Sequence, residues 1–299
     1  MALNHDDKEK AFNEIETKNS ERPVKNVCVI TGGGSGMGLA TAKVMGESHY
    51  IIISGRTVSK LEHAIDELKL MGIEAEAFPC DVSKREDVVA LAHRAMAIGD
   101  VEVVIHAAGM SPTMADAQKI MAVNALGTIH VNEIFYDVMS EGGCLIDVSS
   151  MSAYFMPKAI LPMKAFKLSR VDKKLFMAKM MKRVNLFPKK MRSQIAYGMS
   201  KAFVVWYAKT DAGKFGERHL RVLSISPGSF ETPMGDAEKD NLQEYIESSA
   251  LKRLGDVEEI AFLMAACADK RAGYLTGVDI LCDGGCVASG VGSIKAKLS

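Results

Sequence analysis

The chain has 299 residues and no net charge, because 37 Lys and Arg balance 37 Asp and Glu. With 48% hydrophobic residues it can form one substantial core. No apolar run reaches the roughly 18 residues that cross a bilayer, which argues against stable membrane insertion. The six cysteines are scattered singly, without the spacing of a metal site. We therefore expect no metal, and buried thiols in a reducing cytoplasm.

Residues 1–24 form a charged extension without an apolar centre, so no secretory signal is expected there. Two interpretations of this extension stay open. It is either a mobile tail or a short helix that docks on the body of the protein or on a neighbouring subunit. From residue 25 to the end, strand and helix patterns alternate without a linker. This pattern predicts a single α/β domain over residues 25–299.

A glycine-rich turn at residues 31–38 follows the apolar run at residues 27–30. The helical stretch at residues 39–45 and a second apolar run at residues 50–54 complete a strand, helix, strand unit. Glycines allow a tight turn that lies close to a pyrophosphate, and the free amides at the start of the helix attract its charge. The turn therefore predicts a dinucleotide-binding site.

The spacing T-G-x-x-x-G-x-G of this turn resembles the short-chain dehydrogenase/reductase family, and further motifs of that family follow in the same order. These are H-A-A-G at residues 106–109, where the family usually has N-N-A-G, then Asn124, the serine doublet at residues 149–150, Y-G-M-S-K at residues 197–201, P-G at residues 227–228 and D-G-G at residues 283–285. The resemblance implies a single Rossmann-type, doubly wound parallel sheet with helices on both faces. It also implies NAD(H) or NADP(H) as cofactor and a homo-oligomer, either a dimer or a homotetramer.

Tyr197 and Lys201 are the expected proton-transfer pair. The ordinary pKa of tyrosine, about 10, is too high for an efficient base near neutrality. Lys201 lies one helical turn later on the same face, where its charge would lower that pKa. A second Tyr-x-x-x-Lys at residues 154–158 contains Pro157, which disfavours the helix that this geometry needs. We therefore expect Tyr154 to line the substrate site instead.

A hydroxyl at the carboxyl end of a central strand can hydrogen-bond a substrate oxygen. The resemblance selects Ser150 for this role over its rivals Ser149 and Ser152, the alternative being a serine that only caps a turn. It also implies that Asn124 holds a water that links Lys201 to solvent, whereas a structural Asn would need a backbone partner. The expected catalytic residues are Asn124, Ser150, Tyr197 and Lys201, and the expected substrate contacts are Ser150, Ser152, Tyr154 and Tyr197.

The type of cofactor stays open between NAD(H) and NADP(H). Gly55 stands where NAD-dependent relatives usually carry an acid, and Arg56 suits a 2′-phosphate. Ser35, however, stands where many NADP-dependent relatives carry a basic residue, so the motifs favour NADP only slightly. The residues expected to bind the cofactor are Gly32, Gly34, Ser35, Gly36, Met37, Gly38, Arg56, Asp81, Val82, Ala108, Gly109, Tyr197, Lys201, Pro227, Gly228, Phe230 and Thr232.

A basic, Met-rich insertion at about residues 155–194 separates the serine doublet from Tyr197. It contains twelve Lys or Arg and six Met against a single acid, Asp172. Phe176, Met180 and Val184 recur at steps of four and predict a helix over residues 171–185. Three interpretations compete: a lid over the substrate, which the position favours; an inert insertion docked on the protein; or a contact with a membrane or partner.

We expect a cytoplasmic enzyme that interconverts a secondary alcohol and a ketone on a small-molecule substrate. The extension, the insertion and its methionines look like bacterial hydroxysteroid dehydrogenases, including those that act as 20β-hydroxysteroid dehydrogenases. The alternatives are a reductase of a 3-oxoacyl thioester or anionic ketone, and a catalytically silent dinucleotide-binding regulator. Nucleic acid is not an expected partner, because aromatic side chains that could stack on bases are sparse in the basic segment.

Overall fold

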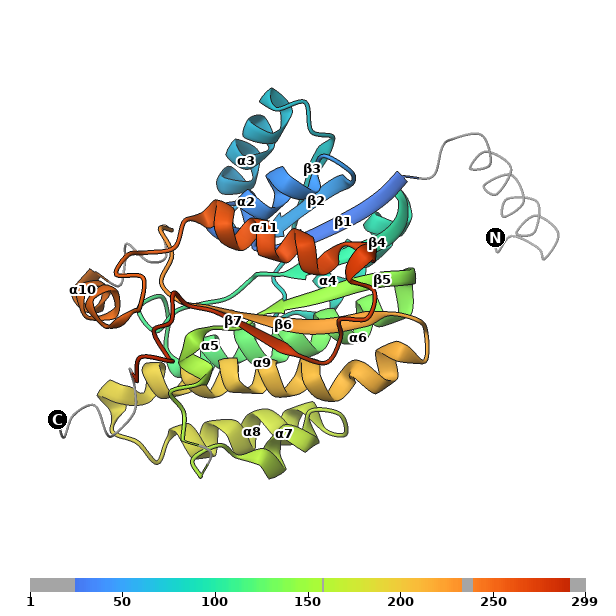
Figure 1. Ribbon diagram of the computed structural model, residues 1–299. Helices are drawn as coiled ribbons and strands as arrows, with labels where there is room; N and C mark the ends of the chain where they lie inside the picture. Colours follow the sequence, from blue (N-terminus) through green and yellow to red (C-terminus); the bar gives the residue numbers. More distant parts are fainter. Residues whose placement is uncertain (1–24, 158, 233–238, 291–299) are drawn as a thin grey trace.

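The sheet is built from short strands rich in Val, Ile and Ala, as expected for a parallel sheet that is buried on both faces. The computed structural model describes residues 25–157, 159–232 and 239–290 (Figure 1). All the strand pairs in this part of the chain are parallel, in the order β3-β2-β1-β4-β5-β6-β7. The expected doubly wound parallel sheet is confirmed. The strands are β1 (Lys25–Thr31), β2 (Tyr50–Gly55), β3 (Ala75–Pro79), β4 (Gly99–His106), β5 (Met139–Val148), β6 (Arg221–Pro227) and β7 (Asp279–Cys282).

The strand order reverses between β1 and β4. From β1 the chain moves outward to β2 and β3, and it then continues on the other side of β1 with β4 to β7. At such a switch point the loops that leave the carboxyl ends of the two central strands diverge and open a crevice. The glycine turn after β1 and the loop after β4 therefore border the same crevice.

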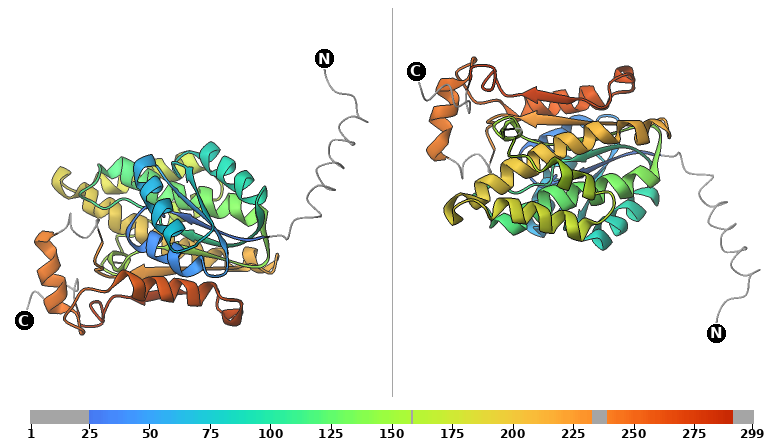
Figure 2. Two further views of the ribbon diagram at one scale, coloured as in Figure 1. Left: turned by 90° about the horizontal axis from the view of Figure 1, so that it is seen from above. Right: turned by 90° about the horizontal axis from the view of Figure 1, so that it is seen from below.

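Helices cover both faces of the sheet (Figures 1 and 2). One face carries α2 (Gly36–Met45), α3 (Val58–Leu70) and α11 (Val257–Ala268), and the other carries α4 (Arg85–Met96), α5 (Ala117–Met121), α6 (Gly127–Val138) and α9 (Arg192–Gly216). The π-helical segment η1 (Ala122–Leu126) joins α5 to α6, while η2 (Met151–Ala153), η3 (Lys189–Met191) and η5 (Lys270–Ala272) are single 3₁₀ turns. Within the described ranges, no helix is both long and apolar enough to span a membrane.

The insertion before Tyr197 contains α7 (Met163–Leu168) and α8 (Lys173–Val184), and both helices pack on α9. The helix expected over residues 171–185 is thus confirmed, although it begins two residues later. Its apolar face, formed by Phe176, Met180 and Val184, is fully buried. The Phe176 ring lies 4.8 Å from the ring of Phe203 on α9. The helical part of the insertion is therefore docked on the core, which supports the second of the three interpretations, while the lid stays a prediction.

Two other expectations concern segments that the structure covers only in part. The N-terminal extension, residues 1–24, lies outside the described residues. The resemblance to the family also implies a substrate loop over residues 233–251. Residues 233–238 lie outside the described residues too, and α10 (Lys239–Ser248) follows at the carboxyl end of the sheet (Figure 1).

Candidate active site

The glycine turn between β1 and α2 lies tightly against the backbone of the loop that follows β4. Gly32 has a φ of +73°, and a Cβ at this residue would lie 2.8 Å from backbone atoms of Ala107 and Ala108. A Cβ at Gly38 would lie 2.4 Å from the carbonyl oxygen of Gly32. Neither position can hold a side chain without displacing the backbone, so glycine at both keeps the turn close-packed and its surface free of side chains.

The N-terminus of α2 follows this turn and carries no side-chain cap. Ser35 is the N-cap residue, but its hydroxyl makes no capping hydrogen bond, and the first turn of the helix contains no acid. The first amides of a helix have no partner within the helix and attract an anion. The turn and the helix together are therefore suited to a pyrophosphate.

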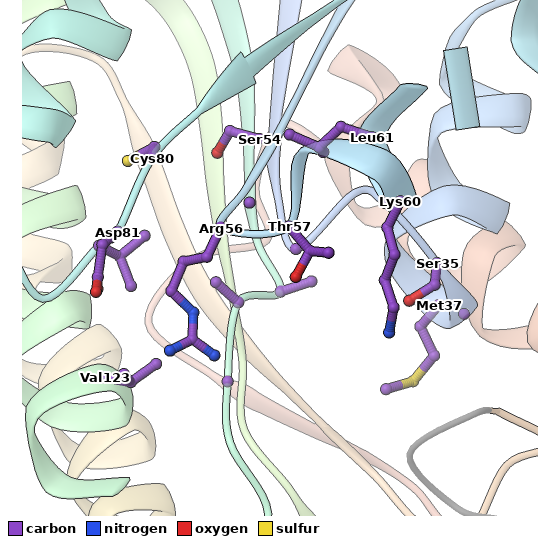
Figure 3. A pocket seen from close by; sticks show the side chains of 18 of the residues that line it. Ser35, Met37, Ser54, Arg56, Thr57, Lys60, Leu61, Cys80, Asp81 and Val123 are labelled. Carbon is purple, nitrogen blue, oxygen red and sulfur yellow. The ribbon is translucent and has the colours of Figure 1, made fainter. Parts of the chain in front are cut away.

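A cavity of about 200 Å³ opens beside the turn, between the ends of β1 to β4 (Figure 3). Gly38, Tyr197, Lys201, Pro227, Gly228 and Phe230, all expected at the cofactor, do not line it. The ring of Phe230 packs instead on Gly255, where a Cβ would lie 2.4 Å from the Phe230 Cε1 atom. The remaining expected cofactor residues do line the cavity: Gly32, Gly34, Ser35, Gly36, Met37, Arg56, Asp81, Val82, Ala108, Gly109 and Thr232.

Two cationic side chains line the cavity beyond the end of β2. Arg56 follows the strand, and Lys60 lies near the start of α3 (Figure 3). Both residues are exposed, and no ion pair within the described part of the chain involves either of them. Such cations suit a phosphate group. Lys60 was not among the expected residues, although its position four residues after Arg56, at the start of a helix, could have indicated it.

Asp81 forms another wall of the cavity as a carboxylate that is already hydrogen-bonded. Its Oδ1 accepts from the backbone N–H of Ser83 at 3.0 Å and from the Ser83 hydroxyl at 2.6 Å, and Lys119 Nζ donates to its Oδ2 at 3.1 Å. Burial acts to raise the pKa of Asp81, but these hydrogen bonds outweigh burial and hold the pKa below its usual value. Asp81 is therefore an ionised acceptor, as an adenine amino group requires.

Tyr197 and Lys201 lie one turn apart on α9. Lys201 is buried, and its Nζ donates to the carbonyl oxygen of Val148 at 2.8 Å. The same nitrogen lies 5.8 Å from the centre of the Tyr197 ring. Burial lowers the pKa of Lys201 to about 8, although the charge of Asp147 acts in the opposite direction. The lysine charge is thus close enough to act on the tyrosine.

Gly109 connects this pair to the cavity. It lines the cavity, and a Cβ at this residue would lie 3.4 Å from Lys201 Nζ and 3.5 Å from Asn124 Oδ1. The lysine and the asparagine therefore lie directly beside the end of the cavity.

Asn124 ties the loop after β4 to α9. Its Oδ1 accepts from the backbone N–H of Met110 at 2.8 Å, and its Nδ2 donates to the Met110 carbonyl oxygen at 3.0 Å and to the Ser200 hydroxyl at 3.2 Å. The backbone partner that a structural Asn needs is therefore present. Asn124 lies within the π-helical segment η1, a type of helix that often occurs at functional sites.

The two residues of the serine doublet differ in their hydrogen bonds. The Ser149 hydroxyl is buried and donates to the carbonyl oxygen of Lys201 at 2.9 Å. The Ser150 hydroxyl accepts from the backbone N–H of Ser152 at 3.1 Å, as a capping serine does. A hydroxyl that accepts a hydrogen bond can still donate its own proton. Within the doublet, Ser150 is therefore the residue that remains able to donate to a substrate.

Tyr154, the tyrosine of the second Tyr-x-x-x-Lys, is oriented towards β7. Residues 154–157 form a turn and a bend rather than a helix. The Tyr154 hydroxyl donates to Asp279 Oδ2 at 2.5 Å. Burial, together with this hydrogen bond, holds the pKa of Tyr154 above its usual value. Tyr154 is therefore poorly suited to proton transfer near neutrality.

Two family models match the chain in sequence. The model described as short chain dehydrogenase matches residues 26–163, and the model described as enoyl-(acyl carrier protein) reductase matches residues 188–287. The chain belongs to the short-chain dehydrogenase/reductase family. Members of this family are NAD(P)-dependent oxidoreductases that act on alcohol or carbonyl groups. Residues 164–187, which include α8, lie between the two matches.

This short-chain dehydrogenase is 27% identical over 269 residues to short-chain dehydrogenase/reductase bsc3 of Alternaria brassicicola, which covers 88% of this chain and 96% of that protein. It is 24% identical over 274 residues to the 7α-hydroxysteroid dehydrogenase of Escherichia coli K12, with coverages of 86% and 92%. A solved short-chain dehydrogenase from Burkholderia cenocepacia J2315 in complex with NADP has a TM-score of 0.71 at 20% identity, covering 89% of this chain and all of that one. At such identity the structural likeness supports the fold alone.

His106 is buried in the sheet of this short-chain dehydrogenase, at a position where the family resemblance implies Asn. Its Nδ1 lies 2.8 Å from Thr31 Oγ1, while its Nε2 has no hydrogen-bond partner within the described residues. Burial lowers the pKa of His106 to about 3, and the charge of Lys201 acts in the same direction. The imidazole is therefore neutral in the folded protein at every ordinary pH.

Replacing His106 by Asn is expected to make the folded state less sensitive to acid. In the unfolded chain a histidine binds a proton as the pH falls below 6.5, whereas the folded protein resists protonation down to about pH 3. The stability linked to His106 is therefore present above pH 6.5 and is lost as the pH falls, by about 2 kcal/mol at about pH 5. Urea unfolding near neutrality and at about pH 5 measures this loss, which the variant should lack. An equal loss in both proteins would contradict the assignment.

Proposed function

We propose that this short-chain dehydrogenase interconverts a secondary alcohol and a ketone, with NADP(H) as the preferred cofactor. The cavity for the dinucleotide and the Lys201 side chain come together at Gly109, which lines the cavity and at which a Cβ would lie 3.4 Å from Lys201 Nζ. Lys201 shares one face of α9 with Tyr197. This convergence of a dinucleotide cleft with a tyrosine and lysine pair supports the reaction.

The fit to a dinucleotide rests on the chain's own features. The glycine turn leaves no room for a Cβ, the start of α2 is uncapped, and Asp81 is held as an ionised acceptor. The glycine turn and the start of α2 match a pyrophosphate that approaches the backbone, and Asp81 matches an adenine amino group. Gly32, Ser35 and Gly36 would hold the pyrophosphate, and Asp81 and Val82 the adenine.

In the reductive direction, the protein holds the carbonyl oxygen and supplies one proton to it. Ser150 donates a hydrogen bond to that oxygen, and Tyr197 transfers its phenolic proton to the same atom. Lys201 stabilises the tyrosinate that remains. When bound, the reduced nicotinamide supplies a hydride to the carbonyl carbon. In the oxidative direction the tyrosinate accepts the hydroxyl proton instead.

Arg56 and Lys60 are proposed to bind the 2′-phosphate of NADP(H). Replacing either residue by Ala is expected to weaken NADPH binding about 10-fold to 100-fold, because a hydrogen bond to a charged group contributes about 1.5 to 3 kcal/mol. Binding of NADH, which has no phosphate there, should change little. Fluorescence titration with both dinucleotides measures the effect. The matched control is Lys69→Ala, at the opposite end of α3 from Lys60. Tighter binding of NADH than of NADPH by the wild type would refute the preference.

A bulky apolar substrate, such as a steroid, is proposed for the reaction. An apolar side chain lies beside the residue that follows Tyr197: Met156 packs on Gly198, where a Cβ would lie 2.7 Å from the Met156 sulfur. The ring of Phe155 stacks on that of Tyr245 of α10 with centroids 6.4 Å apart. The similarity to the 7α-hydroxysteroid dehydrogenase of Escherichia coli also supports this substrate class.

A panel of steroid ketones and alcohols, small ketones and 3-oxoacyl thioesters, assayed with NADPH and NADH, tests the function. We expect the highest kcat/KM with a steroid. A higher kcat/KM with a 3-oxoacyl thioester than with any steroid would contradict the steroid proposal and favour the thioester as the substrate class. Dinucleotide binding without turnover of any compound would instead favour a catalytically silent regulator.

We further propose that the enzyme works in the cytoplasm as a homo-oligomer. The absence of disulfides within the described residues, where the six cysteines are free thiols, is compatible with a reducing compartment. Strand β7 forms an edge of the sheet, and the family resemblance assigns subunit contacts to this strand. The resemblance assigns subunit contacts to α9 too, but α7 and α8 of the same chain already cover part of that helix.

A further inference from the structure

A row of buried polar side chains crosses the sheet beside the carboxyl ends of its strands. Thr31, His106, Asp147 and Ser224 are direct register partners on β1, β4, β5 and β6. Each is at most 2% exposed. Two residues earlier on β5, Leu145 belongs to the core cluster that α6 and α9 cover, so strand alternation places the row on that face. Ionisable side chains at such buried positions are costly unless they have partners or a function.

Asp147 is held mainly by one amide. Asn132 Nδ2 lies 2.9 Å and 3.0 Å from the two carboxyl oxygens of Asp147, and it also donates to the Thr128 carbonyl oxygen at 3.0 Å. No cation lies within ion-pair distance of Asp147 in the part of the chain that the structure describes. The Thr128 hydroxyl donates to the Asn124 carbonyl oxygen at 2.7 Å. Hydrogen bonds through Asn132 and Thr128 thus connect Asp147 with the backbone of Asn124.

Lys201 approaches Asp147 from the same side of the sheet. Its Nζ donates to the carbonyl oxygen of Val148, the residue that follows Asp147. The charge of Lys201 acts to lower the pKa of Asp147, and the charge of Asp147 acts to raise the pKa of Lys201. Burial raises the pKa of Asp147 to about 8 and lowers that of Lys201 to about 8. Burial thus disfavours the charge on each group, while the charge on each group favours the charge on the other.

We propose that Asp147 is a positioning residue for Lys201: its carboxyl group, held by Asn132, favours the charged ammonium and through it the ionisation of Tyr197. This inference rests on the proposed role of Tyr197 as the proton-transfer residue. The mechanism described above uses neither Asp147 nor Asn132. Their effect is indirect: in molecules in which Asp147 is ionised, the carboxylate stabilises the lysine cation, and the lysine cation stabilises tyrosinate.

The other ionisable groups around Asp147 do not compete for this role. From β4, His106 faces it as a neutral imidazole, since burial lowers the pKa of that group to about 3. From α9, Asp211 also acts on Asp147, but Asp211 is paired with Arg170 at 2.6 Å. Tyr207 of α9 is buried, and its pKa lies above the usual value for that reason. Lys201 is thus the one cation that acts on Asp147 within the described residues.

Ultraviolet titration of tyrosine ionisation tests the proposal directly. The wild-type curve minus the Tyr197→Phe curve isolates the titration of Tyr197, and the same subtraction is made in an Asp147→Asn background. We expect the midpoint of Tyr197 to rise by about one pH unit in Asp147→Asn, because the variant removes a charge that favours the lysine cation. An unchanged or lower midpoint overturns the proposal. Ser224→Ala, in the same buried row but without an ionisable group, should keep the wild-type midpoint.

A second variant covers the case in which Asp147→Asn does not fold. Asn132→Ala removes the donor that favours the charged carboxylate, so the Tyr197 midpoint should rise in the same direction but by less; no rise overturns the proposal. Dinucleotide affinity and the urea midpoint, measured for each variant, separate this effect from a general loss of structure. Because the titration needs no substrate, a failure to turn over any ketone would count against the proposed function and leave this result standing.

Discussion

Tyr197→Phe is expected to reduce turnover by about 10²-fold to 10⁴-fold or more, because a positioned general acid contributes that much to a proton-transfer step. The change removes one hydroxyl from a half-buried ring and leaves α9 intact. Dinucleotide binding and the urea midpoint should therefore stay close to those of the wild type. The measurement is kcat with the best ketone of the panel, together with fluorescence titration of NADPH.

Tyr154→Phe is the matched control, since Tyr154 opens the second Tyr-x-x-x-Lys of the chain. Its hydroxyl hydrogen-bonds Asp279, and residues 154–157 are not helical. We expect a loss of less than about 10-fold in kcat, well below that of a missing general acid. A larger loss for Tyr154→Phe than for Tyr197→Phe would exchange the roles of the two tyrosines.

Local patterns in the sequence were enough to predict the fold and most of the cavity. The glycine turn acts through its own backbone, so Gly32 and Gly36 could be placed from neighbours in sequence alone. The same holds for Tyr197 and Lys201, because a spacing of four on a helix determines their common face. Lys60 has such a signal too, in its spacing from Arg56, but it belongs to no motif of the family and was missed.

Contacts between distant segments could not be predicted in this way. The partner of the Ser149 hydroxyl is the carbonyl oxygen of Lys201, which lies on another element. Likewise, Asp147 meets Asn132 only because β5 packs under α6. An amphipathic pattern tells which face of a helix is apolar but not what covers that face. For this reason the spacing of Phe176, Met180 and Val184 predicted a helix correctly but could not distinguish a docked insertion from a lid.

Phe176→Ala is expected to lower the free energy of unfolding by about 3 to 5 kcal/mol, the usual cost of removing a buried phenyl ring. Phe176 is fully buried and contacts Phe203, so the change leaves a cavity between α8 and α9. A loss of this size is a large part of the roughly 5 to 15 kcal/mol that stabilises a typical domain. Urea unfolding measures it. Leu175→Ala on the same helix, at a residue that is 40% exposed, should cost less than about 1 kcal/mol.

The kinetics of the same two variants distinguish a docked insertion from a lid. Since α8 buries its apolar face in the core, Phe176→Ala should change stability far more than kcat or KM at a temperature where the variant stays folded. A lid would give the opposite result, because loosening it affects closure over the substrate more than the free energy of unfolding. Unchanged stability with a strongly raised KM in Phe176→Ala would therefore favour the lid, and with it a direct role for α8 in substrate binding.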